Sequence, residues 1–274
     1  MILLLTTSTG SPDRLADLSR LIGSLAAAHH GHALRHVVLL QNGVAYPGPV
    51  PEWCEIVSYP GKLSLSAARN RLFAHVGPAL AQAEIVGFPD DDAWYTETWL
   101  DVLAARFAEH RPAVLLTRYA TTPSETPAAA QVMQLSPARI IYWTASPSMF
   151  VSGRAAARAA CFDTRLSVGP GAIWNGGEDT DFAMRAAGAE GGVMLDAPCV
   201  GHRDRIRQVA LNYIVGNTFV IARHVKRHPS LVPLLLKKWA IFMGFAAIGQ
   251  VPLSRLGPFL RAQGVALAGR EVVG

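Results

Sequence analysis

An apolar run that ends in three consecutive carboxylates constrains the fold of this chain more than any other stretch. Residues 85–88 read as a buried strand, and Pro89 is followed at once by Asp90, Asp91 and Asp92. Three adjacent carboxylates repel one another, so a fold that gathers them needs a cation or hydrogen-bond donors to offset the repulsion. The stretch predicts a strand that delivers acids to a site. A solvated turn or a helix N-cap is the alternative, because Asp favours both.

Strand-like and helix-like segments alternate along the first part of the chain. Apolar runs typical of buried strands occur at 2–7, 37–40, 55–59, 85–88 and 113–117. Helical spacing of apolar residues lies between several of them, as at 15–25 and 99–107. This alternation predicts an α/β fold with a mostly parallel, twisted sheet and helices on both faces. Further along, 139–144 reads as a strand, 154–160 as a helix of small residues, and 193–195 as a last short strand.

A second acidic cluster follows a pair of glycines at 176–177. Glu178, Asp179 and Asp181 then stand at the start of an expected helix, where the helix dipole stabilises a carboxylate by about 0.3–1 kcal/mol. Successive helical residues are about 100° apart, so the three acids cannot share one face. We expect one or two of them to enter a site while another caps the helix or faces water.

The region from residue 204 onward has a helical and basic pattern, which divides the chain into a domain at 1–203 and a C-terminal region at 204–274. The sequence has 25 Lys and Arg against 20 Asp and Glu, and the later part carries most of the excess. Basic residues beside Trp239, Phe242 and Phe245 favour an interfacial helix on an anionic membrane. Packing against a partner in a homodimer is the alternative.

Several observations bear on location. Cys54, Cys161 and Cys199 are widely spaced and lack a metal-binding spacing, which favours reduced thiols in a cytosolic protein. The N-terminus lacks the features of a signal peptide, and no segment reaches the roughly 20 apolar residues of a membrane span, with 239–249 the nearest approach. We therefore expect a cytoplasmic protein at the inner face of the cytoplasmic membrane. Nucleic-acid binding would explain the positive charge but none of the acids.

Taken in order, the motifs of the chain resemble those of the family 2 glycosyltransferases of the GT-A fold. They are a hydroxyl-rich loop after the first strand, Ser-Ala-Ala-Arg-Asn at 66–70, the D-x-D at 90–92, Gly-Gly-Glu-Asp-Thr-Asp at 176–181 and a lone His202. The resemblance runs from about residue 2 to 202. It implies a Rossmann-like GT-A fold and an inverting, metal-dependent glycosyltransferase that uses a nucleoside-diphosphate sugar, with a UDP-sugar as the expected donor.

The resemblance also implies roles for single residues. Asp92, His202 and Asp90 would hold Mn²⁺ or Mg²⁺, both of which accept carboxylate oxygen, and the imidazole favours Mn²⁺. Asp179 would be the catalytic base. The expected donor- and nucleotide-facing residues are Thr7, Thr9, Gln41, Ser66, Arg69, Asn70, Asp90 and Asp91, and the expected acceptor-positioning residues are Trp174, Gly177 and Glu178. Gln41 stands where many relatives carry Asp, which leaves the nucleotide open.

The expected acceptor is a saccharide or a lipid-linked saccharide in the synthesis of bacterial surface polysaccharide or glycolipid. Two other classes would explain part of the pattern. A metal-dependent nucleotidyltransferase also places acids at a strand end, but the expected glycine-rich phosphate signature is missing. A non-catalytic relative that only binds nucleotide sugars would have less need of both acidic clusters.

Overall fold

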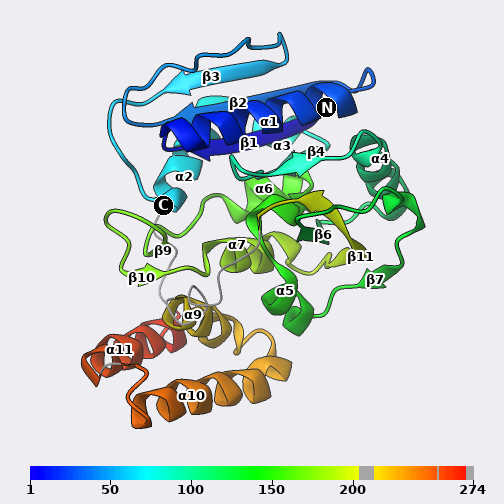
Figure 1. Cartoon of the computed structure of the whole chain (residues 1–274). Helices are drawn as coiled ribbons and strands as arrows, with labels where there is room; N and C mark the ends of the chain where they lie inside the picture. Colours follow the sequence, from blue (N-terminus) through cyan, green and yellow to red (C-terminus); the bar gives the residue numbers. More distant parts are fainter. Residues whose placement is uncertain (204–212, 252, 270–274) are drawn as a thin grey trace.

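A computed structural model describes residues 1–203, 213–251 and 253–269 of the chain; the predicted basic helical segment at 204–212, with Arg205 and Arg207, lies outside the described residues. The strands are β1 (Ile2–Ser8), β2 (Leu34–Leu40), β3 (Cys54–Ser58), β4 (Ile85–Gly87), β5 (Trp94–Tyr95), β6 (Val114–Ala120), β7 (Val132–Gln134), β8 (Met149–Val151), β9 (Leu166–Ser167), β10 (Trp174–Asn175) and β11 (Gly192–Gly201). Within the described part, nine of them form one sheet in the order β3-β2-β1-β4-β8-β6-β11-β5, with β7 also on β11 (Figure 1). Strands β9 and β10 form a separate pair.

The longest strand pairs in this sheet are parallel. Strand β1 runs parallel to both β2 and β4, β2 to β3, and β6 to β11. The short strands β8, β5 and β7 join it in antiparallel pairs. The expected mostly parallel α/β architecture is therefore confirmed, and the antiparallel strand β8 separates its two parallel parts.

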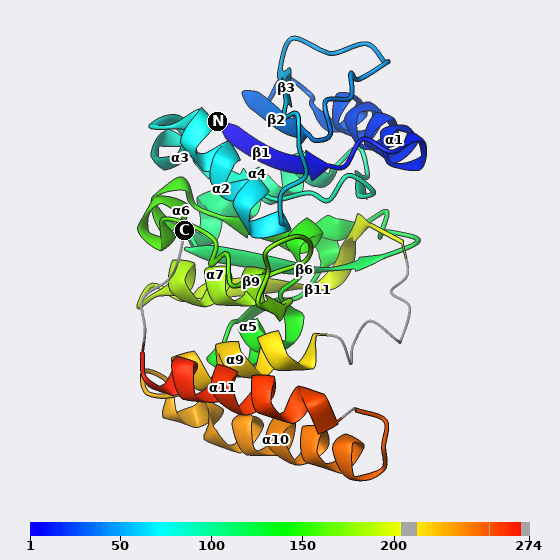
Figure 2. The same cartoon turned by 90° about the vertical axis from the view of Figure 1, so that its left-hand side faces the viewer.

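Helices cover both faces of the sheet (Figures 1 and 2). They are α1 (Pro12–Ala28), α2 (Leu65–Val76), α3 (Ala79–Gln82), α4 (Trp99–His110), α5 (Pro137–Trp143), α6 (Gly153–Ala159), α7 (Glu178–Ala187), α9 (Ile214–His224), α10 (Val232–Ala247) and α11 (Leu256–Leu267). Helices α1 and α4 bury their apolar stripes in one core, and α2, α3, α6, α7 and α9 contribute to the other. Because both faces are covered, the successive residues Leu3, Leu4 and Leu5 of β1 are all buried.

The predicted strand at 139–144 is wrong, because these residues lie in helix α5. The hydroxyl of Ser136 accepts a hydrogen bond from the backbone N–H of Arg139, and Pro137 occupies the first turn, where its missing N–H costs nothing. Ile140 is buried while Tyr142 is 66% exposed. A short apolar run reads equally well as a strand or as a helix, and here the capping residues upstream determine the outcome.

The C-terminal helices differ in how deeply they are integrated. Helix α9 places Phe219, Val220 and Ile221 in the same core as α2 and α7. Helices α10 and α11 form an outer pair, joined where the rings of Phe242 and Phe259 stack with centroids 3.9 Å apart. Both views place this pair at the end of the molecule opposite β3 (Figures 1 and 2). The division of the chain at residue 203 stays a prediction.

One helical stretch of the described residues, Pro229–Ala247, is long and apolar enough to cross a membrane by length and composition. The sequence-based expectation that no segment reaches this length was therefore too strict. The expectation counted the uninterrupted apolar run, whereas this helical stretch of 19 residues includes Lys237 and Lys238. Helix α10, which forms most of this stretch, packs against α9 and α11.

Candidate active site

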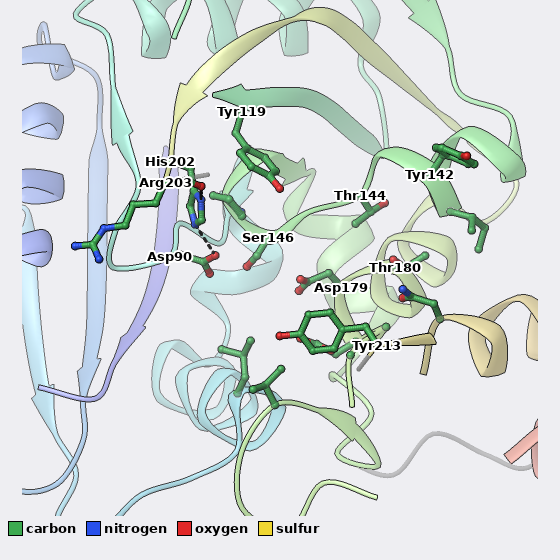
Figure 3. Close-up of a pocket in the computed structure, with 18 of the residues that line it drawn as sticks. Asp90, Tyr119, Tyr142, Thr144, Ser146, Asp179, Thr180, His202, Arg203 and Tyr213 are labelled. Atoms are coloured by element: carbon green, nitrogen blue, oxygen red, sulfur yellow. Dashed lines mark hydrogen bonds and ion pairs between the residues drawn. The ribbon is translucent and has the colours of Figure 1, made fainter. Parts of the chain in front are cut away.

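A cavity of about 620 Å³ opens where strands β4, β6 and β11 end. Its lining comes from the loop after β4, the ends of β6 and β11, helix α5 and the following turn, the start of α7, and helices α9 and α10. Figure 3 shows Asp90 and His202 on one side of this space, with Ser146 between Asp90 and Asp179. Segments far apart in the sequence thus meet around one hollow, with acids on two sides of it.

The short strand β5 brings the first acidic cluster to His202. After Asp92 the chain crosses to the far edge of the sheet, where Trp94 of β5 pairs with Gly201 of β11 in antiparallel register. A Cβ at Gly201 would overlap the ring of Trp94, so only glycine permits this approach. His202 follows directly, and its ring therefore lies beside the carboxylates that precede β5.

Asp90, Asp92 and His202 place one possible ligand atom each within 4.8 Å of one another. The Nε2 atom of His202 lies 3.1 Å from Asp92 Oδ1 and 3.5 Å from Asp90 Oδ2. Its Nδ1 lies 2.8 Å from the Arg203 carbonyl oxygen, to which Nδ1–H can donate, so that Nε2 is directed at the acids. Two carboxylates and one imidazole are suitable ligands for Mn²⁺, which binds both oxygen and nitrogen. Mg²⁺ would bind the carboxylate oxygens of the same set. The chemistry of these residues therefore fits the expected metal.

A proton on His202 offsets the negative charge of this cluster in the protein without metal. Burial alone would lower the pKa of His202, but its hydrogen bonds to Asp90 and Asp92 and their charges raise the pKa to about 10. Burial would likewise raise the pKa of Asp92, yet His202 and Arg14 hold it at about 2. A cation bound between these side chains must displace that proton, so metal binding is coupled to proton release.

Arg14, in the first turn of α1, is a member of this cluster that the sequence analysis missed. Its Nη1 lies 2.8 Å from Asp91 Oδ1 and 2.9 Å from Asp92 Oδ2. Burial raises the pKa of Asp91 to about 6, although a hydrogen bond from Ser8 and the charge of Arg14 act in the opposite direction. Asp91 thus has Arg14 as a basic partner, and its contact with a nucleotide stays a prediction. The only available signal was indirect, since α1 begins just after β1, which neighbours β4 in the sheet.

The second acidic cluster is positioned by a tight glycine turn. Gly176 and Gly177 have φ values of 74° and 89°, in the left-handed region that favours glycine. A Cβ on Gly216 of helix α9 would overlap the carbonyl oxygen of Gly176, so α9 crosses this turn with almost no space between the backbones. Helix α7 then begins at Glu178. The glycine pair therefore sets both the direction of α7 and the closeness of α9.

Arg69 of helix α2 connects the two acidic clusters. Its side chain is 3% exposed, its guanidinium bonds both Asp179 and the hydroxyl of Ser146, and its Nη2 lies 3.5 Å from Asp90 Oδ1. Opposite charges favour the ionised forms of both partners in a site with little water. Arg69 is thus placed to hold the Asp179 carboxylate in one orientation.

Glu178 has the surroundings of a carboxyl group that is protonated in about half of the molecules near pH 7. It lines the cavity, is 4% exposed, and its Oε2 atom has no hydrogen-bond partner among the described residues. Burial raises the pKa of Glu178 to about 7, the charge of Asp179 adds to this effect, and Arg69 opposes it. A protonated Glu178 can donate a hydrogen bond into the cavity beside the ionised Asp179.

Asp181 neither caps the helix nor faces water, contrary to the expectation for the third acid. It is fully buried, and it lies 3.0 Å from Arg223 and 3.1 Å from His224 of helix α9, and 2.8 Å from Arg185 of its own helix. Burial would raise the pKa of Asp181, but these partners hold it far below the usual range. This ion-pair network fixes α9 to α7 directly below the cavity. The sequence could indicate only Arg185, four residues further along the same helix, because Arg223 and His224 lie 42 and 43 residues away.

The remaining predicted site residues lie around the cavity without lining it. Trp174 stacks on Phe219 with ring centroids 4.4 Å apart and closes the wall behind α7. Gln41 accepts a hydrogen bond of 2.7 Å from the backbone of Leu63, and Ser66 donates one of 2.6 Å to the carbonyl of Leu166.

Three further residues with a predicted nucleotide contact belong to the same group. Asn70 exchanges two hydrogen bonds with the backbone of Phe162. Thr7 and Ser8 are the last two residues of β1, and the carbonyl oxygen of Thr9 accepts a hydrogen bond from the side chain of Asn42. The described contacts of Gln41, Ser66 and Asn70 hold the wall of the site together, and a contact of these residues with a nucleotide stays a prediction.

Several residues that line the cavity carried no motif in the sequence. They are Arg14, Tyr119, Tyr142, Thr144, Ser146, Tyr213, Asn217 and Lys238. Tyr119 packs edge-on against the ring of His202, with centroids 5.1 Å apart. Tyr213, Asn217 and Lys238 come from the C-terminal helices, so one side of the cavity is built by a region that the sequence suggested only for membrane or subunit contact.

Solved structures of glycosyltransferases share this fold. S. aureus TarS 1-349 in complex with UDP matches 98% of this chain and 87% of its own, with a TM-score of 0.64 and 16% identity. The complex with UDP-GlcNAc gives a TM-score of 0.63 at 17% identity, over 97% of this chain and 81% of its own. The mannosyltransferase PcManGT from Pyrobaculum calidifontis, in complex with GDP-Man and Mn²⁺, gives 0.52 at 13% identity, over 97% and 85%.

Scans of the sequence against protein-family models and against curated proteins found no match. At the low identities of the structural matches, the shared feature is the fold. It is a mixed α/β fold of the GT-A glycosyltransferase type, with a mostly parallel sheet between helices. What the chain does has to be argued from its own site.

Proposed function

We propose that this chain is an inverting, metal-dependent glycosyltransferase that moves a hexose from a nucleoside-diphosphate sugar to a saccharide or lipid-linked acceptor. The observation that carries the proposal is the arrangement of one cavity, with a candidate metal cluster of Asp90, Asp92 and His202 on one side and Asp179 beside Glu178 on the other. Transfer of a glycosyl group needs both halves. One half holds the diphosphate and the other takes a proton from the acceptor hydroxyl.

On the donor side, Asp90, Asp92 and His202 would hold Mn²⁺ or Mg²⁺. When bound, such an ion would neutralise the charge that builds on the departing diphosphate. His202 and Arg14 both favour the ionised form of Asp92, and Arg203 also lines this side of the cavity. The solved relatives support a nucleotide-sugar donor, since TarS was solved with UDP and UDP-GlcNAc and PcManGT with GDP-Man and Mn²⁺. We favour a UDP-sugar, in keeping with the two higher TM-scores.

On the acceptor side, Asp179 is the proposed general base. As the acceptor oxygen attacks the anomeric carbon, its proton passes to the Asp179 carboxylate, and the bond from that carbon to the diphosphate breaks with its electron pair on the diphosphate oxygen. Attack from the face opposite the leaving group inverts the configuration. Arg69 orients Asp179 in this step, and the protonated carboxyl of Glu178 is placed to donate a hydrogen bond to the acceptor.

The experiment is a screen of nucleotide sugars with and without Mn²⁺ or Mg²⁺. We expect at least one UDP-sugar or GDP-mannose to raise the melting temperature in a metal-dependent way, because a ligand that binds only the folded state stabilises it. The same donor should release nucleoside diphosphate slowly when water serves as acceptor. A nucleotidyltransferase would instead release pyrophosphate from a nucleoside triphosphate, and a non-catalytic relative would bind the donor without releasing any product.

A further inference from the structure

Helix α10 presents an apolar stripe to the outside of the molecule. Five of its exposed positions are apolar, namely Val232, Leu236, Ala240, Met243 and Ala247, and Lys237 is exposed beside them. At 100° per residue, the offsets of 4, 8, 11 and 15 residues place them at 40°, 80°, 20° and 60° from the first, so they form one narrow stripe. We call this set the α10 stripe. An apolar stripe of a soluble helix normally faces the core, and this one faces away from it.

The side of α10 that adjoins the stripe is already packed against the protein. Leu235, Phe242 and Ala246 are buried, and the Trp239 indole donates a hydrogen bond of 3.2 Å to Gln263 of helix α11. In the most apolar 18-residue window of the stretch Pro229–Ala247, 22% of the residues are buried. A spanning orientation would either break these contacts or carry the partner helix α11, which has only 12 residues, into the hydrocarbon core with α10. An orientation along a surface keeps them and covers only the α10 stripe.

The charged Lys, Arg, Asp and Glu side chains of the C-terminal helical segment are all of one sign. Residues 213–269 contain seven Lys and Arg and no Asp or Glu. Arg223 is used in the buried network with Asp163 and Asp181. The other six make no ion pair with any described residue, and they are Lys226, Arg227, Lys237, Lys238, Arg255 and Arg261. An apolar stripe in an exclusively cationic region matches a surface that is apolar inside and anionic at its headgroups.

We propose that the α10 stripe docks on an anionic lipid bilayer, with α10 lying in the plane of the headgroups. A second copy of the chain fits less well. A twofold dimer would place the same patch on both sides of the interface, so the cations of one copy would face those of the other without any acid of this region between them. The inference concerns binding alone and does not depend on glycosyl transfer.

Docking in this orientation has a consequence for the cavity. Lys238 lies on α10 and lines the cavity, as do Tyr213 and Asn217 of the neighbouring helix α9. The helix that meets the bilayer is therefore also a wall of the proposed acceptor side.

The test is flotation of the full chain with phosphatidylcholine vesicles, with or without phosphatidylglycerol. We expect the protein to float with the anionic vesicles at about 0.1 M salt, and on the order of tenfold less protein to float with neutral vesicles. Binding should weaken at about 1 M salt, where the Debye length falls to about 3 Å. Absence of flotation with anionic vesicles at low salt would overturn the proposal, whether or not the enzyme proves active.

Variants locate the binding to the stripe. Leu236→Gln with Met243→Gln removes apolar surface without changing charge, and we expect at least about a tenfold loss of vesicle binding. The control is Val50→Gln with Ile173→Gln, which removes two other exposed apolar side chains and should float like the wild type. Equal flotation of both double variants would overturn the assignment to the stripe. A dimer interface would give a different result. Light scattering would then show a dimer for the wild type and a monomer for the stripe variant, and neither protein would float with the vesicles; this result would also overturn the proposal.

Discussion

Replacing Arg69 by Gln separates the role that the structure assigns to this residue from the role suggested by the sequence. The motif at 66–70 predicts that Arg69 meets the nucleotide, whereas in the structure it bonds Asp179 and Ser146 and lies 3.5 Å from Asp90. If Arg69 orients the base, Arg69→Gln lowers kcat. If Arg69 instead holds the donor, the variant raises the donor KM and leaves kcat largely intact.

The size of the effect can be worked from the burial of the partners. Removing one member of a buried ion pair costs about 3–5 kcal/mol. The side chains of Asp179 and Asp90 are 18% and 32% exposed, so water relieves part of that loss, and we expect the free energy of unfolding to fall by about 2–3 kcal/mol. A base displaced by about 1 Å lowers the rate about 100-fold.

The assay is steady-state release of nucleoside diphosphate, together with urea unfolding of each variant. Arg71→Gln is the matched control, because Arg71 lies in the same helix, is exposed, and contacts only the ring of Tyr59 at 4.9 Å among the ring contacts described. The double variant with Asp179→Asn should be no slower than Asp179→Asn alone, since Arg69 acts through Asp179. A wild-type kcat for Arg69→Gln, or fully multiplicative losses in the double variant, would refute the reasoning.

Three further predictions follow from the site and the core. Gly201→Ala should weaken Mn²⁺ binding by about 10- to 100-fold in calorimetry, because a Cβ at this position displaces Trp94 and with it His202. The control Gly23→Ala has open space around the new Cβ and should bind Mn²⁺ like the wild type. Equal Mn²⁺ affinities of the two variants would contradict this prediction. Asp92→Ala should make donor affinity independent of metal, as chelation does in the wild type, and a surviving metal effect would remove Asp92 from the ligand set. Burial lowers the pKa of His36 to about 3, so the unfolded chain binds the extra proton below pH 6.5. From pH 7 to pH 5 the free energy of unfolding of the wild type should then fall by about 2 kcal/mol more than that of His36→Gln. Urea unfolding of both proteins across this pH range measures the difference, and the same pH dependence in both would contradict the prediction.

The features predicted correctly from the sequence are local patterns. The strand before Asp90 and the glycine turn before Glu178 are encoded within a few residues, because buried strands are apolar and tight turns need glycine. The helical start at Glu178 follows from the same stretch. The fold class was also predictable, since alternating strand and helix patterns admit few arrangements.

The features that could not be predicted depend on contacts between distant segments. Arg14 meets Asp91 only because α1 begins at the edge of the sheet where β4 ends, and no residue near Arg14 indicates this. The pairing of Arg69 with Asp179 joins positions 110 residues apart. Residues 139–144 were mistaken for a strand because a short apolar run has no periodicity of its own, and the cap at Ser136 made it a helix.

The central claim is that Asp179 is the base of a glycosyl transfer whose donor is held at the other side of the same cavity. The most direct test is the Asp179→Asn variant, measured for donor affinity by calorimetry and for nucleoside diphosphate release with the donor found in the screen. The account predicts an unchanged donor Kd in the presence of metal and a loss of kcat of at least about 100-fold, the usual contribution of a general base. A variant that turns over within a few-fold of the wild type would contradict it.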